Sequence, residues 1–160
     1  MNTLTIPALL SSESPEETEA IGASLADRML SDRSLPHFVA LYGDLGVGKT
    51  AFIRGFTSRI APNARVKSPT FSLVHEYRGE HLSVFHFDLY RIEDEDELYS
   101  IGFYDYLDRR GICLTEWSEK IEYALPDRYL RVEILKNSVE RVDARQLRID
   151  TVGFEVTENL

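Results

Sequence analysis

The amino-acid sequence predicts an α/β domain with a mixed β-sheet, and three observations support this. Apolar runs of strand character, 38–42 and 112–115, alternate along the chain with segments of helical periodicity, as in helices packed on a sheet. Residues 129–134 and 146–150 alternate apolar and polar side chains, which is typical of an antiparallel hairpin with one face in solvent. The chain has 160 residues, enough for a substantial core, so we expect 1–160 to form a single domain.

The first helix has a clear start signal. A short strand is expected around 4–6, and Ser14, Pro15 and Glu17 follow it. A serine N-cap, a proline in the first turn and a glutamate that completes a capping box are typical of a helix N-terminus. The apolar residues at positions 20, 21, 25 and 29 keep the spacing of one helical face behind it.

The middle of the chain predicts a helix, a hairpin and an acidic helix start. The helix that follows the glycine-rich stretch is expected to run to about Ile60. Segments 71–77 and 82–88 have strand character and flank a turn at 78–80, which predicts a hairpin. The acidic run 93–97 suits a helix N-terminus, and this helical stretch is expected to end at Gly111. Such a charge run is usually a solvated helix start, and less often a docking face for a partner.

The charge balance limits what the chain can hold directly. Lys and Arg number 18 and Asp and Glu 27, a formal net charge of −9, whereas a protein that grips nucleic acid by itself needs a dense basic surface. Any RNA is therefore expected to be held by a partner. The one cysteine, Cys113, lies in an apolar run and is expected to be buried and unpaired, as in a reducing compartment. The sequence has neither a secretory signal pattern nor an apolar run of membrane-spanning length, so the cytoplasm is the expected location.

Residues 43–50 match the phosphate-binding pattern G-x-x-x-x-G-K-[ST] in full. The candidate contacts are Gly43, Asp44, Leu45, Gly46, Val47, Gly48, Lys49 and Thr50. The glycines let backbone N–H groups approach phosphate closely, Lys49 supplies charge for the β- and γ-phosphates, and the Thr50 hydroxyl suits Mg²⁺. A strand-like run precedes the motif and a plausible helix follows it, so the helix N-terminus faces the anion. The sequence therefore predicts nucleotide binding on a P-loop NTPase-like three-layer fold.

Two carboxylates occupy the strand-end positions that a P-loop site needs. Asp88 follows the run 84–87, and Glu116 follows 112–115. Either could hold Mg²⁺, directly or through water, while the other orients or deprotonates the attacking water. Together with Lys49 they are the candidate catalytic residues, and the sequence leaves their individual roles open.

Three further side chains near these positions have alternative interpretations. His86 lies within an apolar strand and is expected to be a core histidine, or one that supports a neighbouring group, rather than a catalytic one. Trp117 either packs in the core or stacks near the nucleotide. Thr70 is either a turn residue or a hydroxyl that senses the γ-phosphate, as in a switch segment.

Four segments occur in an order that resembles one family. They are Gly-Asp-Leu-Gly-x-Gly-Lys-Thr at 43–50, Lys-Ser-Pro-Thr-Phe at 67–71, His-x-Asp-x-Tyr-Arg at 86–91 and Glu-Trp-Ser-Glu at 116–119. Together they resemble the TsaE (YjeE) family, the bacterial ATPase of tRNA threonylcarbamoyladenosine biosynthesis. The resemblance extends over roughly residues 14–125, and the tail hairpin is compatible with it.

The resemblance implies a function that the phosphate-binding motif alone does not. Members of the family bind ATP and Mg²⁺ and hydrolyse ATP weakly on their own. They act with the TsaB–TsaD pair, which transfers a threonylcarbamoyl group to adenosine 37 of tRNAs that read codons beginning with A. ATP turnover is thought to reset that complex between rounds, so tRNA is expected to reach this chain only through its partners. No arginine is tied to a motif as an arginine finger, which fits a site that a partner completes.

The resemblance also implies roles for individual residues. Thr50 and Glu116 match the residues associated with Mg²⁺, and Asp88 matches the family's essential strand-end aspartate. Trp117 matches the tryptophan beside the nucleotide, and Thr70 matches the switch-like threonine.

The adenine site is implied more loosely, because the N-terminal segment has no sharp motif. In the family the adenine is held near the first helix, which makes Thr18 and its neighbours candidate contacts. One departure from the family pattern is Ala51, where a second threonine often follows the phosphate-binding loop. This position is not a required ligand.

Two other functions remain open. A P-loop kinase for a small metabolite would need a second substrate pocket and usually an arginine-bearing lid, and the chain is short for an added substrate domain. A nucleotide-dependent switch such as a small GTPase would carry an Asn-Lys-x-Asp motif for guanine, which this sequence lacks.

Overall fold

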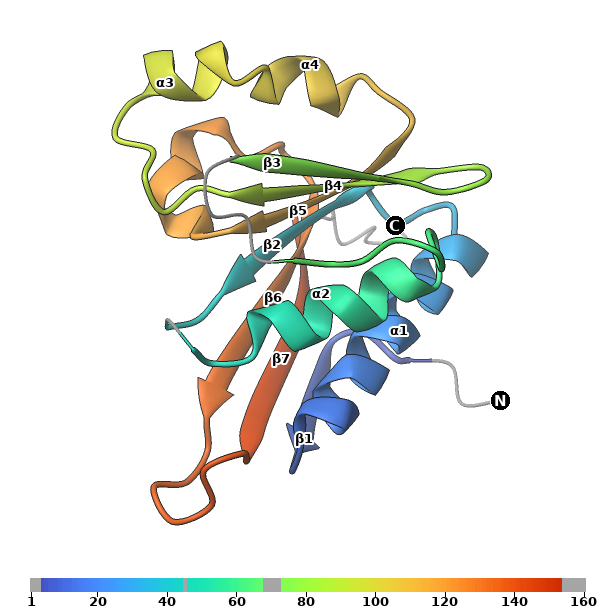
Figure 1. The fold of residues 1–160 in the computed structure, drawn as a ribbon, viewed down its shortest axis with the longest axis vertical. Helices are drawn as coiled ribbons and strands as arrows, with labels where there is room; N and C mark the ends of the chain where they lie inside the picture. The colour runs from blue at the N-terminus through green and yellow to red at the C-terminus, as the bar shows by residue number, and fades with distance from the viewer. Residues whose placement is uncertain (1–3, 45, 68–72, 154–160) are drawn as a thin grey trace, which may run out of the picture.

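A computed structural model describes residues 4–44, 46–67 and 73–153 (Figure 1). Its strands are β1 (Ala8–Ser12), β2 (Phe38–Tyr42), β3 (Val74–Arg78), β4 (Ser83–Asp88), β5 (Gly111–Glu116), β6 (Tyr129–Lys136) and β7 (Arg145–Val152). Its helices are α1 (Pro15–Ser31), α2 (Lys49–Ser58), α3 (Glu95–Ser100), α4 (Phe103–Leu107) and the 3₁₀ segment η1 (Ser118–Ala124). Within the described residues, the strands form one 7-stranded sheet in the order β1-β7-β6-β2-β5-β4-β3.

The sheet is mixed, as predicted. β2 pairs in parallel with both β5 and β6, and β4 pairs in parallel with β5. The β1–β7, β6–β7 and β3–β4 pairs are antiparallel. The predicted C-terminal hairpin is formed by β6 and β7, and it lies inside the sheet between β2 and β1.

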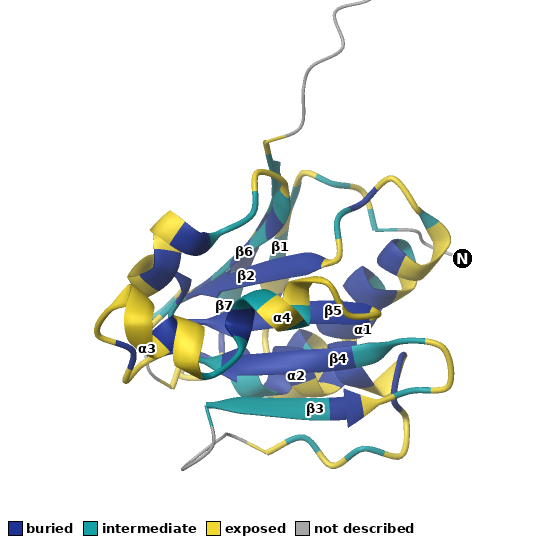
Figure 2. Ribbon diagram, turned by 90° about the horizontal axis from the view of Figure 1, so that it is seen from above, coloured by how far each residue is buried: buried dark blue, intermediate teal, exposed yellow. Residues whose placement is uncertain are grey.

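Helices cover both faces of the sheet, which confirms the predicted three-layer fold (Figure 1). Val39 and Leu41 of β2 pack with α1 and α2 in one apolar core. Phe38 and Ala40 pack on the opposite face with α3, α4 and η1. All residues of β2 are buried, and buried positions follow the central strands in Figure 2. The strand that leads into the phosphate-binding motif is therefore enclosed on both faces, as a central parallel strand should be.

α1 and α2 meet through two glycines. A Cβ at Gly22 would overlap the carbonyl oxygen of Phe52, and a Cβ at Gly55 would overlap that of Glu19. The two helix backbones are therefore in direct contact, at a separation that only residues without a Cβ allow.

The first strand was predicted wrongly and the first helix correctly. No strand forms at 4–6, and β1 begins at Ala8, because Pro7 has no N–H to donate to the sheet. The α1 helix begins as expected, with the Ser14 hydroxyl accepting a hydrogen bond from the Glu17 N–H at 3.1 Å.

The helical stretch that was predicted to end at Gly111 ends earlier and in two pieces. Gly102 has a φ of 82°, in the left-handed region, and separates α3 from α4, which ends at Leu107. Gly111 instead begins β5, where a Cβ would lie 2.6 Å from the Ser83 carbonyl oxygen and from the Phe85 ring. This glycine is therefore a strand residue that lets β5 approach β4 closely.

The predicted hairpin and the predicted buried cysteine are both observed. β3 and β4 pair antiparallel, and positions 71 and 72 of the predicted first strand lie outside the described residues. Cys113 is buried, and burial raises the pKa of its thiol to about 12, so the thiol stays protonated near neutral pH. Among the helices of the described chain, none combines the length and the apolar character needed to cross a membrane.

Candidate nucleotide-binding site

Residues 43–48 connect β2 to α2 in a loop built on left-handed glycines. Gly43, Gly46 and Gly48 have φ values of 147°, 76° and 110°, a region that other residues rarely adopt. A Cβ at Gly43 would also lie 2.7 Å from the Ile134 carbonyl oxygen, so this glycine lets the loop pass close to β6. The α2 helix has no side-chain N-cap. Its first N–H groups and the positive end of its dipole are therefore available to an anion at the loop.

The remaining residues of the predicted loop differ in exposure. Asp44 is exposed, whereas Val47 is buried in the core under α1 and α2. Thr50 is half-buried and is the second residue of α2. Leu45 lies outside the described residues. The buried Val47 side chain anchors the loop while the backbone on either side of it stays open to a ligand.

Lys49 is folded back over its own loop. Its Nζ donates a hydrogen bond to the Gly43 carbonyl oxygen at 2.8 Å and lies 4.2 Å from the centroid of the Trp117 ring. The side chain is 5% exposed. Burial lowers the pKa of Lys49, and the charge of Glu116 is the largest of the effects that oppose this. A bound phosphate would offer the ammonium group a stronger partner than a neutral carbonyl.

Asp88 and Glu116 end adjacent parallel strands and lie opposite each other in the β4–β5 register. The Leu89 N–H donates to the Glu116 carbonyl oxygen at 3.2 Å, which continues the pairing one residue past β4. Asp88 Oδ1 accepts the Tyr90 N–H at 3.2 Å. Burial raises the pKa of the Asp88 carboxyl, the Tyr90 N–H lowers it, and the Glu116 charge raises it further. The structure thus brings the two predicted carboxylates together at the edge where β2 enters the phosphate loop.

His86 contacts Glu116 directly. The imidazole Nε2 lies 2.6 Å from Glu116 Oε2, and both side chains are buried. The sequence indicated a core or supporting histidine, and its burial agrees with that. The identity of its partner depends on the pairing of β4 with β5 and could not be read from the sequence.

Trp117 occupies a strained turn that a buried serine holds in place. Its φ is 61°, and within the described ranges it is the only residue other than glycine with a positive φ. The Ser118 hydroxyl lies 3.1 Å from the Leu41 carbonyl oxygen and 2.9 Å from that of Thr115, which ties the turn after β5 to β2. The indole ring contacts both Lys49 and Tyr90, with its centroid 5.0 Å from that of the Tyr90 ring. Trp117 contacts Lys49 beside the phosphate loop and also packs against the core on the side of α3 and α4, so its position agrees with both interpretations.

Thr18 and Arg145 lie on the other side of the loop. A Cβ placed on Gly48 would be 4.0 Å from both the Thr18 methyl group and Arg145 Nε. Arg145 Nε donates to the Val47 carbonyl oxygen at 2.6 Å, and its Nη1 donates to the Val142 carbonyl oxygen at 2.6 Å. Sequence reasoning missed Arg145, because nothing in the polar connection of a C-terminal hairpin indicates contact with a loop so far away in the chain. Thr70, the predicted switch residue, lies outside the described residues.

The oxygen donors at this edge suit Mg²⁺ better than a transition metal. No group of three or more His, Cys, Asp or Glu side chains in the described ranges is arranged to hold a metal ion. A hydroxyl at Thr50 and carboxylates at Asp88 and Glu116 are hard oxygen ligands. Because Mg²⁺ in nucleotide sites is typically held by one or two carboxylates and the phosphates themselves, this set fits it.

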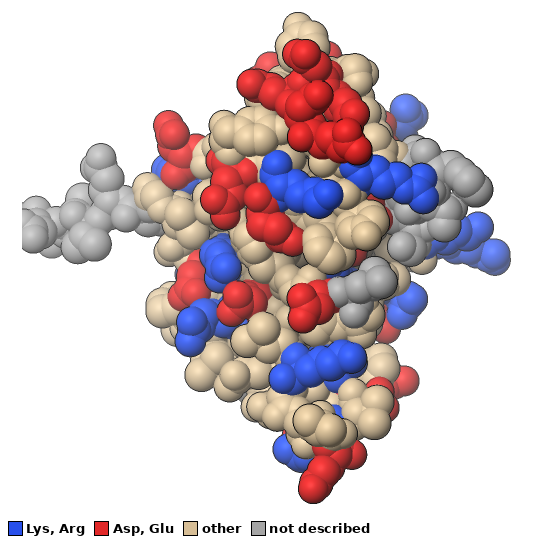
Figure 3. Space-filling view, turned by 90° about the vertical axis from the view of Figure 1, so that its left-hand side faces the viewer, with Lys and Arg blue, Asp and Glu red and all other residues tan. Residues whose placement is uncertain are grey.

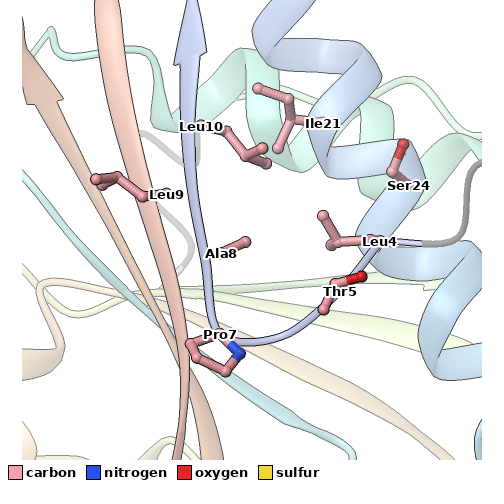
Figure 4. A pocket seen from close by; sticks show the side chains of 8 residues that line it. All are labelled: Leu4, Thr5, Pro7, Ala8, Leu9, Leu10, Ile21 and Ser24. Atoms are coloured by element: carbon pink, nitrogen blue, oxygen red, sulfur yellow. The ribbon is translucent and has the colours of Figure 1, made fainter.

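Two other surface features lie away from these residues. A hollow of about 500 Å³ opens between β1 and α1 and is lined mainly by apolar side chains of the N-terminal segment (Figure 4). The acidic run 93–97 is exposed and forms a negative surface over α3 (Figure 3). Its exposure agrees with a solvated helix start, and Asp94 serves as the N-cap by accepting the Glu97 N–H at 2.9 Å.

The comparison with protein families decides the classification. The family model described as "Threonylcarbamoyl adenosine biosynthesis protein TsaE" matches residues 12–147. The chain belongs to the TsaE family. The match covers the phosphate loop, both strand-end carboxylates and most of the C-terminal hairpin, so the motif-based resemblance is confirmed.

Individual relatives agree with this classification. A Bacillus subtilis protein named "tRNA threonylcarbamoyladenosine biosynthesis protein TsaE" is 37% identical over 139 residues, which cover 87% of this chain and 82% of that protein. A Haemophilus influenzae protein of the same name is 44% identical over 111 residues, covering 69% and 68%. The crystal structure of Bacillus subtilis YdiB superposes with a TM-score of 0.67 at 30% identity, covering 92% of this chain and 86% of the other. This structural similarity is consistent with the predicted P-loop NTPase-like fold class.

Proposed function

We propose that this TsaE-family protein binds ATP with Mg²⁺ and hydrolyses it slowly, in the threonylcarbamoyl modification of tRNA adenosine 37. The observation that carries this proposal is that the phosphate-binding loop and two carboxylates lie at the same end of the parallel strands. Lys49 and Thr50 begin the helix after β2, Glu116 ends β5, which pairs with β2, and Asp88 ends β4, which pairs with β5. The names of the relatives support the role in tRNA threonylcarbamoyladenosine biosynthesis, and the residues of the site support the hydrolysis of ATP.

Each residue has a role that follows from its position. Lys49 exchanges the Gly43 carbonyl for the β- and γ-phosphates, while the N–H groups of the loop and of the first turn of α2 cradle them. Thr50 binds the Mg²⁺ ion, which neutralises charge on the phosphates when it is bound. One of Asp88 and Glu116 holds that ion, and the other orients or deprotonates the attacking water.

The contacts around the nucleotide extend to both sides of the loop. Trp117 lies against the phosphate end, where its ring already contacts Lys49. Thr18 lies beside Gly48 on the side of α1, where we place the adenine and ribose. Thr70 senses the γ-phosphate in this proposal. Residues 1–160 then act as one P-loop ATPase domain in the cytoplasm.

Slow turnover by the isolated chain follows from the arginines near the loop. Of the described arginines, Arg145 lies at the loop, but its guanidinium is engaged by the carbonyl oxygens of Val47, Val142 and Ala144. An arginine supplied by a partner typically raises P-loop turnover by about 10³–10⁵. We propose that a TsaB–TsaD complex completes the site, that ATP turnover resets this complex, and that tRNA is held by the partners because this chain is acidic.

The proposal is tested by steady-state ATP hydrolysis with and without a TsaB–TsaD pair. Lys49→Ala serves as the blank, and Lys136→Ala, an exposed lysine on β6, serves as the matched control. We expect slow turnover by the chain alone and an increase with the partners. Turnover of about 1–100 s⁻¹ without partners, the range of typical kinases, would contradict partner completion. Tight nucleotide binding without hydrolysis, or transfer of phosphate to a small acceptor, would favour a switch or a kinase instead.

A further inference from the structure

We infer that His86 is a positioning residue that holds the Glu116 carboxylate in place for hydrolysis, an inference that rests on the proposed ATPase function. The imidazole Nε2 lies 2.6 Å from Glu116 Oε2. The His86 side chain is fully buried, and Glu116 is 6% exposed. A buried carboxylate with so close a partner cannot rotate without leaving polar atoms unpaired.

The β4–β5 register explains why the two side chains meet. His86 lies opposite Leu114, and Asp88 lies opposite Glu116. Because side chains alternate between the two faces of a strand, these four residues share one face of the sheet. Leu114 belongs to the core packed against α1 and α2. His86 and Glu116 therefore point to the face that carries α2 and the phosphate loop.

Aromatic neighbours from β3 fix the plane of the His86 ring. The Tyr77 ring stacks on it at a centroid distance of 6.5 Å and an interplanar angle of 26°. The His75 ring meets it edge-on, also at 6.5 Å. The Tyr77 hydroxyl is itself held, at 3.3 Å from both the backbone nitrogen and the carbonyl oxygen of Lys67. The imidazole is thus presented to Glu116 in one orientation.

A role in core packing alone does not account for a histidine at this position. His86 Nδ1 has no hydrogen-bond partner among the residues that the structure describes. Burying an imidazole with one nitrogen unpaired costs free energy, which an apolar side chain in the same place would not. The hydrogen bond with Glu116 is an interaction that an apolar side chain could not make, and it explains why a histidine is found here.

Holding Oε2 defines how the rest of the carboxylate faces the nucleotide. With Nε2 against Oε2, the other oxygen, Oε1, is not engaged by His86 and would be the one available to hold a metal ion or to orient the attacking water. Groups that orient metal-associated side chains typically change affinity or activity about 10–100-fold when they are removed. His86 acts through Glu116 and does not itself touch the substrate.

The first test compares His86→Leu with His86→Gln. Leucine fills the site without a donor, whereas glutamine keeps an N–H group near the position of Nε2. We expect His86→Leu to lower kcat about 10–100-fold with an unchanged KM for ATP, and His86→Gln to recover part of that loss. The exposed His81→Gln serves as the control and should match the wild type. An increase in KM without a loss of kcat, or equal losses for leucine and glutamine, would overturn the inference.

A double-mutant cycle with Glu116→Asp separates positioning from general destabilisation. The shorter aspartate cannot reach Nε2 in the same way, so His86→Leu should cause little further loss of kcat in this background. If His86→Leu lowers kcat by the same factor in both backgrounds, the histidine does not act through Glu116.

NMR of the ¹⁵N-labelled imidazole supplies a readout that does not depend on hydrolysis. The Nε2 signal of His86 should shift in Glu116→Gln and stay in place in Glu119→Gln, a substitution of an exposed glutamate in η1. If the wild type shows no Lys49-dependent hydrolysis, the proposed function fails, and the spectrum still decides whether His86 holds Glu116. An unchanged His86 signal in Glu116→Gln overturns the inference by itself.

Discussion

Two sharp turns follow neighbouring parallel strands, and they reach the same sheet edge by different means. The loop after β2 places glycines at its left-handed positions, Gly43, Gly46 and Gly48. The turn after β5 places Trp117 in the left-handed region and holds it there through the buried hydroxyl of Ser118. The glycine loop avoids strain, whereas the tryptophan turn sustains strain with tertiary contacts. The first turn can be recognised in the sequence from its glycines. The second cannot, because its conformation depends on a tertiary contact that only the structure shows.

The largest effects should come from removing the charged group that each turn supplies. We expect Lys49→Ala from the first turn and Glu116→Ala from the second each to lower kcat for ATP on the order of 10²–10³-fold or more. Asp88→Ala, at the end of β4, should do the same. The measurement is phosphate release at saturating ATP and Mg²⁺ with the partner complex present. Unimpaired hydrolysis in any one of these variants would remove that residue from the proposed mechanism.

Next in size is the response of the glycine loop to added Cβ atoms. Gly43→Ala brings a Cβ to 2.7 Å from the Ile134 carbonyl oxygen, whereas Gly46→Ala meets nothing within 4 Å. Both substitutions carry left-handed strain of about 1–2 kcal/mol, and only the first adds a clash worth about 1–3 kcal/mol. Urea unfolding should therefore show a larger loss of free energy for Gly43→Ala. Equal losses would mean that strain alone governs this loop.

The tryptophan turn should depend on Ser118. Ser118→Ala removes the hydroxyl that bridges the Leu41 and Thr115 carbonyl oxygens, and we expect a loss of about 1–3 kcal/mol in the free energy of unfolding. Ser31→Ala, at an exposed serine of α1, should change it by less than about 0.5 kcal/mol. Trp117 fluorescence follows the turn directly, and a wild-type emission spectrum in Ser118→Ala would show that the turn does not need the serine.

The smallest effect concerns the carboxyl group of Asp88. Burial raises its pKa in the folded protein above the ordinary value of 3.8. The folded state therefore holds this proton more tightly than the unfolded state, and stability is lost as the pH rises above 3.8. Asp88→Asn keeps the acceptor for the Tyr90 N–H and removes the charge, so it should raise Tm at pH 7 and lose this advantage near pH 3.5. A lower Tm at pH 7 would show that the buried charge is fully compensated.

The elements that the sequence predicted are those defined by local residue types. The phosphate loop, the N-cap at Ser14 and the alternating C-terminal strands depend on nearest neighbours, and all three are observed. Asp88 and Glu116 were found because carboxylates at the ends of apolar runs are recognisable. Their meeting depends on the parallel pairing of β4 with β5, which the sequence did not predict.

The contacts that the sequence did not predict depend on register and on distant pairing. His86 reaches Glu116 only because β4 and β5 pair with Asp88 opposite Glu116. Arg145 reaches Val47 only because β7 pairs with β6, which itself pairs with β2. The division of the 93–111 stretch at Gly102 was missed because one glycine in a helical pattern does not by itself indicate a break.

The glycine contacts between α1 and α2 have a mechanical consequence. Where the backbone at Gly22 touches Phe52 and that at Gly55 touches Glu19, no side chains lie between the helices to rearrange. We therefore expect α1 and α2 to move together as one rigid unit. Thr18 is part of α1, so a displacement of the first turn of α2 should also displace Thr18.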